Sequence, residues 1–451
     1  MFTELDICLN TYSLSQQMGI RHTSVQSEKG KNKNKRKEKY DYWLPSTSYK
    51  ESMKYESVSI ITNNPGCEQL TGYYTKLEKY FKLNGLIISE SFTADLVVIV
   101  GCGSTDIMLN PVKRLLSDIL SATNSQSKII VSGCIAATCT KQLLEIYNWT
   151  FINYGKEHEF DELIQAKVKY NEVKNTNVFT YPGQVKEHDT DNLFALTIAQ
   201  GCLMRCTYCV INRAYGIIKS KRESEILQEF LLSVKYGYNK IELVATDTSL
   251  YGYDTNTDIV ELMNKLLNLN ADIQFYIVNF NARRLENYYQ GMLDLVKNNK
   301  IAYLHLPIQH VSEYVLKRMN RDINFPFVYD VIKQIKKSQP NIYILTDLIC
   351  GFPGETDSHF NELLKFVEED NCFDGYITNM FWEMPDTPAS KMDQKIDVKI
   401  KQHRLFKLLN KINKKKKQMN QESGALKRFA FASTVGNGEY YFCKESYELL
   451  E

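Results

Sequence analysis

Three cysteines lie close together in one short segment, Cys202-Leu-Met-Arg-Cys206-Thr-Tyr-Cys209. In a loop that follows an apolar run, this spacing allows three thiolates to converge on one face of an iron–sulfur cube. Three cysteine ligands leave the fourth iron of a 4Fe–4S cluster open, and an open iron can chelate the amino and carboxylate groups of a methionine derivative. A structural zinc site normally has four ligands, and the sequence offers no fourth cysteine or histidine nearby. The segment predicts a 4Fe–4S cluster, with zinc or buried free thiols as the alternatives.

Three further cysteines, Cys67, Cys102 and Cys134, each follow a glycine that comes soon after an apolar run. If these runs are neighbouring parallel strands, their carboxyl ends lie at one edge of a sheet, where ligands bind. Three strand ends would then bring three thiolates together, which predicts a second cluster with an open iron. The alternative is that these are ordinary buried cysteines, which behave as small hydrophobes. That alternative does not explain a Gly-Cys pair at each of three strand ends.

The elements that would position the second set of cysteines are short and apolar. Continuous apolar runs are typical of parallel strands that are buried on both faces. Separated by helical patterns, they predict a small doubly wound α/β domain over residues 56–150. The expected strands are 57–63, 94–101 and 127–133, and the expected helices are 68–83 and 111–121.

A second series of six apolar runs follows, at intervals of roughly 30 to 47 residues, with a helical pattern in each gap. Six such units predict an open, partial (β/α)6 barrel over residues 191–395, with the cysteine loop after its first strand. The expected strands are 194–199, 241–247, 273–280, 302–309, 342–349 and 376–381. We expect a linker at 151–190, a basic and disordered extension at 1–55, and a basic amphipathic helix with a short strand-like segment at 396–451.

The composition is that of an ordinary globular protein: 451 residues, 43% hydrophobic and 24% charged. No apolar run is long enough to span a membrane, and the first residues do not resemble a secretory signal. We therefore expect a cytoplasmic protein with no membrane association. In a reducing compartment its 11 cysteines would serve metal or thiol chemistry rather than disulfides.

The combination of an α/β domain with three strand-end cysteines and a C-x3-C-x2-C barrel resembles the radical S-adenosylmethionine (SAM) methylthiotransferases. The likeness runs from about residue 57 to 425. The blocks LHLPIQHVSEYVLKRMNR (304–321) and TDLICGFPGET (346–356) match blocks of that family. The block ATDTSLYGYD (245–254) and the Gln309-His310 pair are more similar to the protein-modifying branch, RimO, than to the tRNA-modifying branch, MiaB.

The resemblance implies two 4Fe–4S clusters and two SAM molecules per reaction. The cluster on Cys202, Cys206 and Cys209 would be reduced by a partner such as flavodoxin or ferredoxin and would cleave SAM, and the resulting radical would remove hydrogen from an unactivated carbon. The other cluster would hold a sulfide that a second SAM methylates. The two must lie close together, because a carbon radical has no time to diffuse.

The resemblance also implies a set of SAM-binding residues. Tyr208 would pack beside the adenine. Thr246 and Asp247 would receive the SAM ammonium group, and Gln309 would contact SAM or substrate. The GFPGET loop would hold SAM through the close backbone approach that Gly351 and Gly354 permit and through hydrogen bonds to Glu355.

The chain departs from the family pattern along the route to the substrate. Asn212, Tyr215, Lys221 and Asp386 stand where the family usually has Pro, Arg, Arg and Gly. Only about 27 residues follow Gly424, too few for the family's complete C-terminal β-barrel, the TRAM domain, so we expect a short remnant in its place. These departures leave the chemistry intact and indicate a different target.

Charge bears on the choice of target. The net charge is +2, but residues 28–39 sum to +5 and 399–428 to +10, so the rest of the chain sums to −13. Nucleic-acid binding depends on clustered Lys and Arg, which disfavours it for the catalytic body. We expect a polypeptide substrate, either a ribosomal protein or the precursor peptide of a ribosomally made natural product. The alternatives are methylthiolation of a tRNA adenosine, peptide maturation by sulfur insertion or crosslinking without methylation, and a non-catalytic electron-transfer or sensing role.

Overall fold

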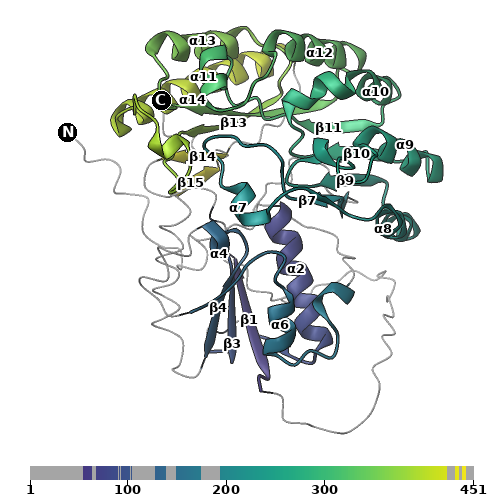
Figure 1. Ribbon diagram of the computed structural model, residues 1–451. Coiled ribbons are helices and arrows are strands. Elements are labelled where there is room, and N and C mark those ends of the chain that lie inside the picture. Colours follow the sequence, from purple (N-terminus) through teal and green to yellow (C-terminus); the bar gives the residue numbers. More distant parts are fainter. Residues whose placement is uncertain are drawn as a thin grey trace, which may run out of the picture.

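A computed structural model gives the architecture of the chain, whose described residues form a five-stranded parallel sheet, an eight-stranded sheet that is parallel except for its last strand, and a small two-stranded antiparallel sheet (Figure 1). Residues 1–53 of the expected extension, the expected helix 111–121, Cys67 and Cys102 lie outside the described residues. The residues that the structure describes are 54–62, 68–89, 91, 93–101, 103, 127–138, 149–173, 193–423, 432–435 and 439–442.

The first sheet has five parallel strands in the spatial order β2-β1-β3-β4-β5. All five side chains of β3, LVVIV, are buried, as expected for a strand covered on both faces. Helix α2 (Glu68–Leu83) packs on the sheet through Leu77 and Phe81. The three expected strands and the helix 68–83 are thus confirmed. The strands are β1 (Ser57–Thr62), β2 (Ile87–Ile88), β3 (Leu96–Val100), β4 (Lys128–Ser132) and β5 (Thr150–Ile152).

This first unit continues beyond residue 150. β5 pairs in parallel with β4, and helix α6 (His158–Leu163) contributes the fully buried Phe160 to the same core. Asn84 fastens the next segment, because its Oδ1 accepts hydrogen bonds from the backbone N–H groups of Lys167 and Val168 at 2.8 and 3.0 Å. The described part of the expected linker therefore packs on the first sheet as far as residue 173.

The second sheet contains the six expected barrel strands, all parallel, in the order β6-β9-β10-β11-β12-β13. β6 and β13 are not paired with each other, so the barrel is open, as the sequence predicts. Alternate side chains point outward into the helices, as Phe275 and Ile277 do, while Val244 and Val278 pack together with Ala195 in a separate cluster. The strands are β6 (Leu193–Thr197), β9 (Lys240–Val244), β10 (Gln274–Ile277), β11 (Ile301–His305), β12 (Tyr343–Cys350) and β13 (Gly375–Met380).

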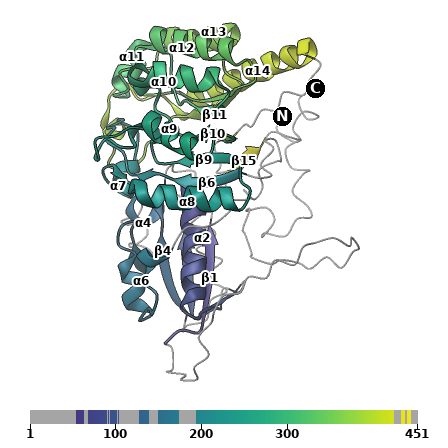
Figure 2. The same cartoon turned by 90° about the vertical axis from the view of Figure 1, so that its right-hand side faces the viewer.

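Helices fill the crossovers of the barrel and cover its outer face (Figure 1). A small antiparallel pair, β7 (Ala199–Gln200) with β8 (Lys219–Ser220), brackets the cysteine loop. Figure 2 shows the barrel standing above the first sheet, with α7 (Ile211–Tyr215) at the boundary. The main barrel helices are α8 (Glu223–Lys235), α9 (Ile259–Leu269), α10 (Leu285–Lys297), α11 (Glu313–Arg318), α12 (Phe325–Ser338), α13 (Asp357–Glu369) and α14 (Val398–Ser423).

The basic helix α14 packs on the barrel rather than standing free. Leu405, Leu408 and Ile412 are buried in the barrel core. Beyond it, β14 (Ala432–Val435) pairs in parallel with β13, and β15 (Glu439–Phe442) pairs antiparallel with β14, so both extend the barrel sheet. Among the described residues, no helix combines the length and the hydropathy that crossing a bilayer requires.

Candidate functional site

The cysteine loop begins at the carboxyl edge of the barrel sheet and is fixed there by a glycine. Gly201 has φ +86°, and a Cβ on it would lie 2.1 Å from the carbonyl oxygen of Ile217. Its N–H donates to Thr246 Oγ1 at 3.1 Å, and the N–H of Cys202 donates to the Gly216 carbonyl at 3.2 Å. The end of β9 and the segment after α7 therefore hold the start of the loop from two sides.

Each of the three sulfurs of this loop has a nearby N–H donor. Cys202 Sγ accepts from the backbone N–H of Met204 at 3.3 Å, and Cys209 Sγ accepts from that of Ile211 at 3.4 Å. Cys206, 9% exposed, lies 3.8 Å from Nη1 of Arg321. Donors aimed at sulfur stabilise thiolates, which are the form that binds iron.

Burial acts against these donors, because it disfavours the charged thiolates. Burial raises the pKa of Cys202 to about 12, and Asp247 adds to the shift. Burial also raises the pKa of Cys209 to about 12, with a further contribution from Cys206. Burial thus disfavours the thiolate forms of Cys202 and Cys209, and a bound metal that displaces their protons would compensate this cost.

The separation of metal ligands differs between a single ion and a cluster. Within the described residues, no three His, Cys, Asp or Glu side chains are close enough to share one metal ion. A cluster places each cysteine on a different iron, so its sulfurs lie farther apart than the ligands of one zinc ion. Cys202, Cys206 and Cys209 stay the predicted ligands of such a cluster.

Arg321, which sequence reasoning did not single out, is the cation of this site. Its Nη1 also lies 3.5 Å from Tyr208 Oη, and its Nη2 donates to Asn281 Oδ1 at 3.4 Å and to the Pro307 carbonyl at 2.5 Å. The residue lies in the block 304–321, but nothing in the sequence showed that it folds back 115 residues to reach Cys206. Tyr208 itself packs edge-on against Phe352, with ring centroids 6.3 Å apart.

Asp247, predicted to receive an ammonium group, faces the cysteine loop. It is 4% exposed, and its Oδ2 lies 3.9 Å from Cys202 Sγ. Ser249 donates to Oδ1 through both its backbone N–H and its hydroxyl, and Asn281 donates to Oδ2 at 3.3 Å. Burial raises the pKa of Asp247, which these hydrogen bonds partly offset. The hydroxyl of its neighbour Thr246 accepts the hydrogen bond from the N–H of Gly201 that is described above.

Gln309 lies four residues after the end of β11, with a φ of +69°, and is 7% exposed. Its backbone joins the neighbouring strand, since its N–H donates to the Asp347 carbonyl and its carbonyl accepts from Ile349. Two residues that the sequence analysis missed lie close by: Nε2 of His305 is 3.1 Å from Oδ1 of Asp347. They occupy adjacent strands, and only the strand register brings them together.

The GFPGET loop follows β12 and adjoins the cysteine loop through Phe352. Gly351 and Gly354 have φ of +75° and +86°, and a Cβ on Gly354 would lie 2.6 Å from Nε of Arg318. Glu355 is 3% exposed, and burial raises its pKa to about 7. Its carboxylate accepts hydrogen bonds from the N–H groups of Gly351 and Phe352 and from Arg404 of α14. These internal partners hold the shape of the loop, and the contact of Glu355 with SAM stays a prediction.

Cys134 is the one cysteine of the predicted second set that lies within the described residues. It opens α4 (Cys134–Thr138), directly after β4, and is 4% exposed. Its Sγ lies 3.1 Å from Oη of Tyr215, which ends α7, the helix that follows Cys209. A Cβ on Gly133 would lie 3.0 Å from the Gly101 carbonyl, so the glycines that precede Cys134 and Cys102 are in close contact. Cys67 and Cys102 are outside the described residues.

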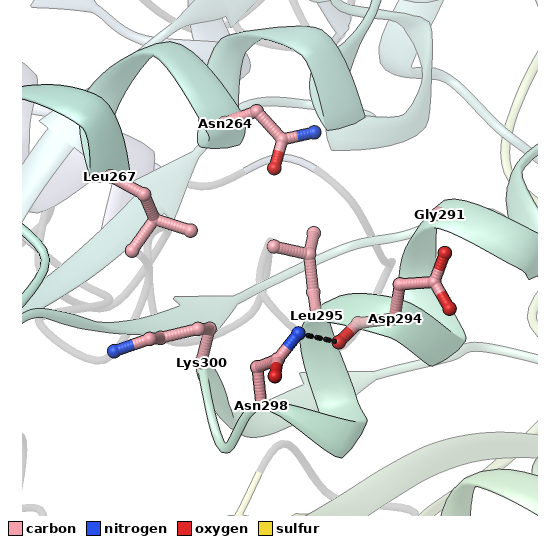
Figure 3. A pocket seen from close by; sticks show the side chains of 7 residues that line it. All are labelled: Asn264, Leu267, Gly291, Asp294, Leu295, Asn298 and Lys300. Atoms are coloured by element: carbon pink, nitrogen blue, oxygen red, sulfur yellow. Dashed lines mark hydrogen bonds between the residues drawn. The ribbon is translucent and has the colours of Figure 1, made fainter.

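A pocket of about 440 Å³ lies elsewhere, between α9 and α10 (Figure 3). Asn264 and Leu267 come from α9, and Asp294 and Leu295 from α10. Lys300 precedes β11, which places the pocket near the amino end of that strand. The predicted site residues are at the carboxyl ends, so this pocket is separate from them.

Comparisons with known proteins agree with this geometry. Residues 196–367 match the model of the radical SAM superfamily. The chain is 31% identical over 337 residues to the ribosomal protein uS12 methylthiotransferase RimO of Protochlamydia amoebophila (strain UWE25), covering 71% of this chain and 70% of that protein. It is 29% identical over 389 residues to the same enzyme of Alkaliphilus oremlandii (strain OhILAs), covering 83% and 86%.

A tRNA-modifying enzyme is also similar. The tRNA-2-methylthio-N(6)-dimethylallyladenosine synthase of Clostridium perfringens (strain 13 / Type A) is 27% identical over 375 residues, covering 79% of this chain and 83% of that protein. Among solved structures, the radical SAM methyltransferase TsrM from Kitasatospora setae, with cobalamin and a 4Fe–4S cluster bound, superposes with a TM-score of 0.52 at 12% identity, covering 74% of this chain and 77% of that one. That likeness supports the fold alone.

Proposed function

This chain belongs to the radical SAM methylthiotransferases of the MiaB/RimO type, and from that premise we propose that it adds a methylthio group to an unactivated carbon of a polypeptide side chain. The family membership makes it an enzyme that uses SAM and a 4Fe–4S cluster. We assign that cluster to Cys202, Cys206 and Cys209, and a second cluster to Cys67, Cys102 and Cys134.

The chemistry of the first site is the cofactor's, since a reduced 4Fe–4S cluster with SAM supplies a one-electron cleavage that can activate a C–H bond. The residues around it bind and orient. Arg321 offsets the negative charge of the thiolates through Cys206. Asp247, fixed by Ser249 and Asn281, presents a carboxylate to an ammonium group. Tyr208 packs against the apolar cluster that includes Phe352 and Phe381, and this cluster keeps water out of that side.

One observation carries the assignment of the second cluster. Cys134, at a strand end of the first sheet, contacts Tyr215 of α7, and α7 follows Cys209 of the first site. This contact supports a second metal site close enough to deliver sulfur to a short-lived substrate radical. The contact between Gly101 and Gly133 supports Cys102 as a co-ligand of Cys134.

Iron content and two cysteine variants test this assignment. After anaerobic reconstitution we expect about eight irons per chain, because two cubes of four are filled. Cys206→Ala should abolish SAM cleavage. Cys102→Ala should still form 5′-deoxyadenosine but should yield no thiolated product. About four irons in the unchanged protein, or full product from both variants, would contradict the two-cluster assignment.

The polypeptide substrate is supported by charge and by the RimO relatives. Outside its two basic segments the chain sums to −13, a poor surface for phosphate-rich RNA. Mass spectrometry of peptides from cells with and without the enzyme should reveal a side chain that carries an added methylthio group. A flavodoxin or ferredoxin is the proposed electron donor. In assays of the purified enzyme, reduced flavodoxin should therefore be able to replace dithionite as the reductant.

Methylthiolation of tRNA is the second candidate, because one similar protein is a tRNA-modifying enzyme and α14 is basic. Tight tRNA binding that weakens steeply with added salt would favour it. Both candidate reactions transfer a methyl group from SAM and should therefore release S-adenosylhomocysteine. Sulfur insertion or crosslinking without methylation would not release it.

A further inference from the structure

The GFPGET loop contacts both the cysteine loop and the helix α14. Phe352 packs edge-on against Tyr208, which lies between two of the predicted cluster ligands. A Cβ on Gly351 would lie 2.4 Å from Cγ of Lys401, so the stem of this lysine packs directly on the loop backbone. The position of α14 therefore limits where the loop can lie, and with it the position of Phe352 beside the cysteine loop.

Arg404, nearly one turn further along α14, forms a buried ion pair with the loop. Its Nη1 donates to the backbone carbonyl of Glu355 at 2.9 Å and to Oε1 of its carboxylate at 3.1 Å. The Arg404 side chain is 7% exposed, and that of Glu355 is fully buried. Nη2 donates to Asp357 Oδ1 at 2.8 Å. Removing one partner of a buried pair leaves an uncompensated charge in the interior, which is costly.

His310 is the other basic side chain in contact range of the Glu355 carboxylate, with Nε2 at 4.0 Å from Oε2. The ring is fully buried, and its Nδ1 accepts the N–H of Ser312 at 2.9 Å. Burial lowers the pKa of His310 to about 3, so the ring is uncharged at neutral pH. His310 therefore does not compensate the negative charge of Glu355, and Arg404 does.

Other titratable groups surround this ion pair. Those among the described residues are Cys350 of β12, Asp357 and His359 of α13, Arg318 of α11 and Lys401 of α14. Arg318 Nε donates to the Pro353 carbonyl at 2.8 Å. Lys401 Nζ donates to the Phe381 carbonyl at 3.3 Å. These two cations thus hold neighbouring carbonyl groups, and the carboxylate of Glu355 is left to Arg404.

The ionised form of Glu355 matters because of the backbone that it holds. Its Oε2 accepts hydrogen bonds from the N–H groups of Gly351 at 2.6 Å and Phe352 at 3.2 Å. Hydrogen bonds to a carboxylate are roughly twice as strong as those to a neutral acceptor. A protonated carboxyl would therefore hold both N–H groups less firmly, and the left-handed turn at Gly351 would loosen.

We propose that Arg404 is a positioning residue of the SAM site, which keeps the Glu355 carboxylate ionised and thereby fixes the loop in the shape that receives SAM. The inference rests on the predicted role of this loop in holding SAM. Arg404 acts through Glu355 and does not itself touch SAM. It makes α14 part of the working site, although this helix lies beyond residues 196–367, which match the radical SAM superfamily.

Arg404→Gln tests the proposal through the pH dependence of SAM binding. The dissociation constant of SAM would be measured by equilibrium dialysis with reconstituted enzyme between about pH 6.5 and 9. Without the guanidinium the pKa of Glu355 rises further, so the carboxyl is protonated at neutral pH and ionises only at higher pH. We expect SAM to bind at least about ten-fold more weakly than to the unchanged enzyme at pH 7, the effect of one lost hydrogen bond to a charged group. The ratio of the two constants should fall towards one at pH 9.

Three variants accompany this measurement. Glu355→Gln fixes a neutral side chain, so its ratio should stay high at every pH. Lys407→Gln, on the exposed face of the same helix, is the matched control and should leave the constant unchanged. If Arg404→Gln does not fold, Arg404→Lys replaces it, because a shorter ammonium group reaches Glu355 less well and its smaller loss should also recover at high pH.

An unchanged constant, or a loss that is the same at pH 7 and pH 9, overturns the inference. Hydrogen exchange of the loop amides without SAM identifies which step failed. We expect Arg404→Gln to speed the exchange of the peptide that contains Gly351 and Phe352 at pH 7. Faster exchange with unchanged SAM affinity would show that the ion pair holds the loop but that the loop does not hold SAM. Unchanged exchange would show that Arg404 does not position the loop.

Discussion

Arg321 shows how one residue can determine the chemistry of a site. Its guanidinium reaches Cys206, a proposed cluster ligand, as well as Tyr208, the amide of Asn281 and a backbone carbonyl. A guanidinium makes several such contacts at fixed angles, whereas the ammonium group of lysine is a single point charge. We infer that the shape of this side chain matters as much as its charge.

We therefore expect Arg321→Lys to slow SAM cleavage. Partners that orient metal ligands typically contribute about 10- to 100-fold to metal affinity or activity, and a loss of that size is expected in 5′-deoxyadenosine formation per bound cluster. The rate would be measured by chromatography after reduction with dithionite. Arg222→Lys, on a side chain that is 81% exposed, is the control. A rate in Arg321→Lys equal to that of the control would show that charge alone suffices.

Sequence reasoning found single residues where a local pattern identified them and missed those that depend on folding. The cysteines stand out because their spacing is local, and Asp247 stands out because it ends an apolar run. Arg321 and the His305–Asp347 pair carry no such mark, since each meets its partner only through strand register or a long return of the chain. Glu355 was identified as part of a motif, but the buried Arg404 that engages it comes from a helix 49 residues later.

At the level of elements, backbone conformation explains how the cysteine loop is held. Gly201 and Gly155 have nearly the same φ, +86° and +82°, but their surroundings differ. A Cβ on Gly201 would collide with the Ile217 backbone, whereas a Cβ on Gly155 would meet nothing within 4 Å. Alanine at either position carries a backbone cost of about 1 to 2 kcal/mol.

Gly201→Ala should therefore cost clearly more stability than Gly155→Ala, because the loop must also move away from Ile217. It should also reduce the iron bound by the first site, since Cys202 is the next residue. Thermal unfolding and iron content of the two purified variants would be compared. Equal unfolding temperatures and equal iron in both variants would mean that the loop absorbs the extra atom without strain.

The strands of the barrel could be predicted because each is an apolar run of ordinary length at a regular interval. β5 could not, because TFI is only three residues long and is recognisable as a strand only beside β4. The packing of Phe160 and Tyr170 on the first sheet escaped prediction for a similar reason. They are single apolar residues in a polar stretch, and their burial depends on the sheet that they cover.

In the whole molecule, the two units meet where α4 and α7 pack together, and a stacked pair of tyrosines adjoins that contact. Tyr154, two residues after β5, and Tyr215, on the barrel side, are stacked there. If the two sites act in sequence on one substrate, this contact sets their separation. Loosening the contact should then reduce the transfer from one site to the other, without impairing the reaction at either site alone.

Tyr154→Ala is expected to uncouple the two half-reactions. The cysteine loop and Arg321 remain in place, so 5′-deoxyadenosine should still form at a rate close to that of the unchanged enzyme. The radical would meet the methylthio group less often because Tyr215 loses the ring that fixes the end of α7. The amount of methylthiolated product per 5′-deoxyadenosine should therefore fall, by up to about a hundred-fold if the misplacement reaches about 1 Å. Tyr236→Ala, at an exposed position, should leave this ratio unchanged. A normal ratio in Tyr154→Ala would show that the contact between the two units does not control the distance between the sites.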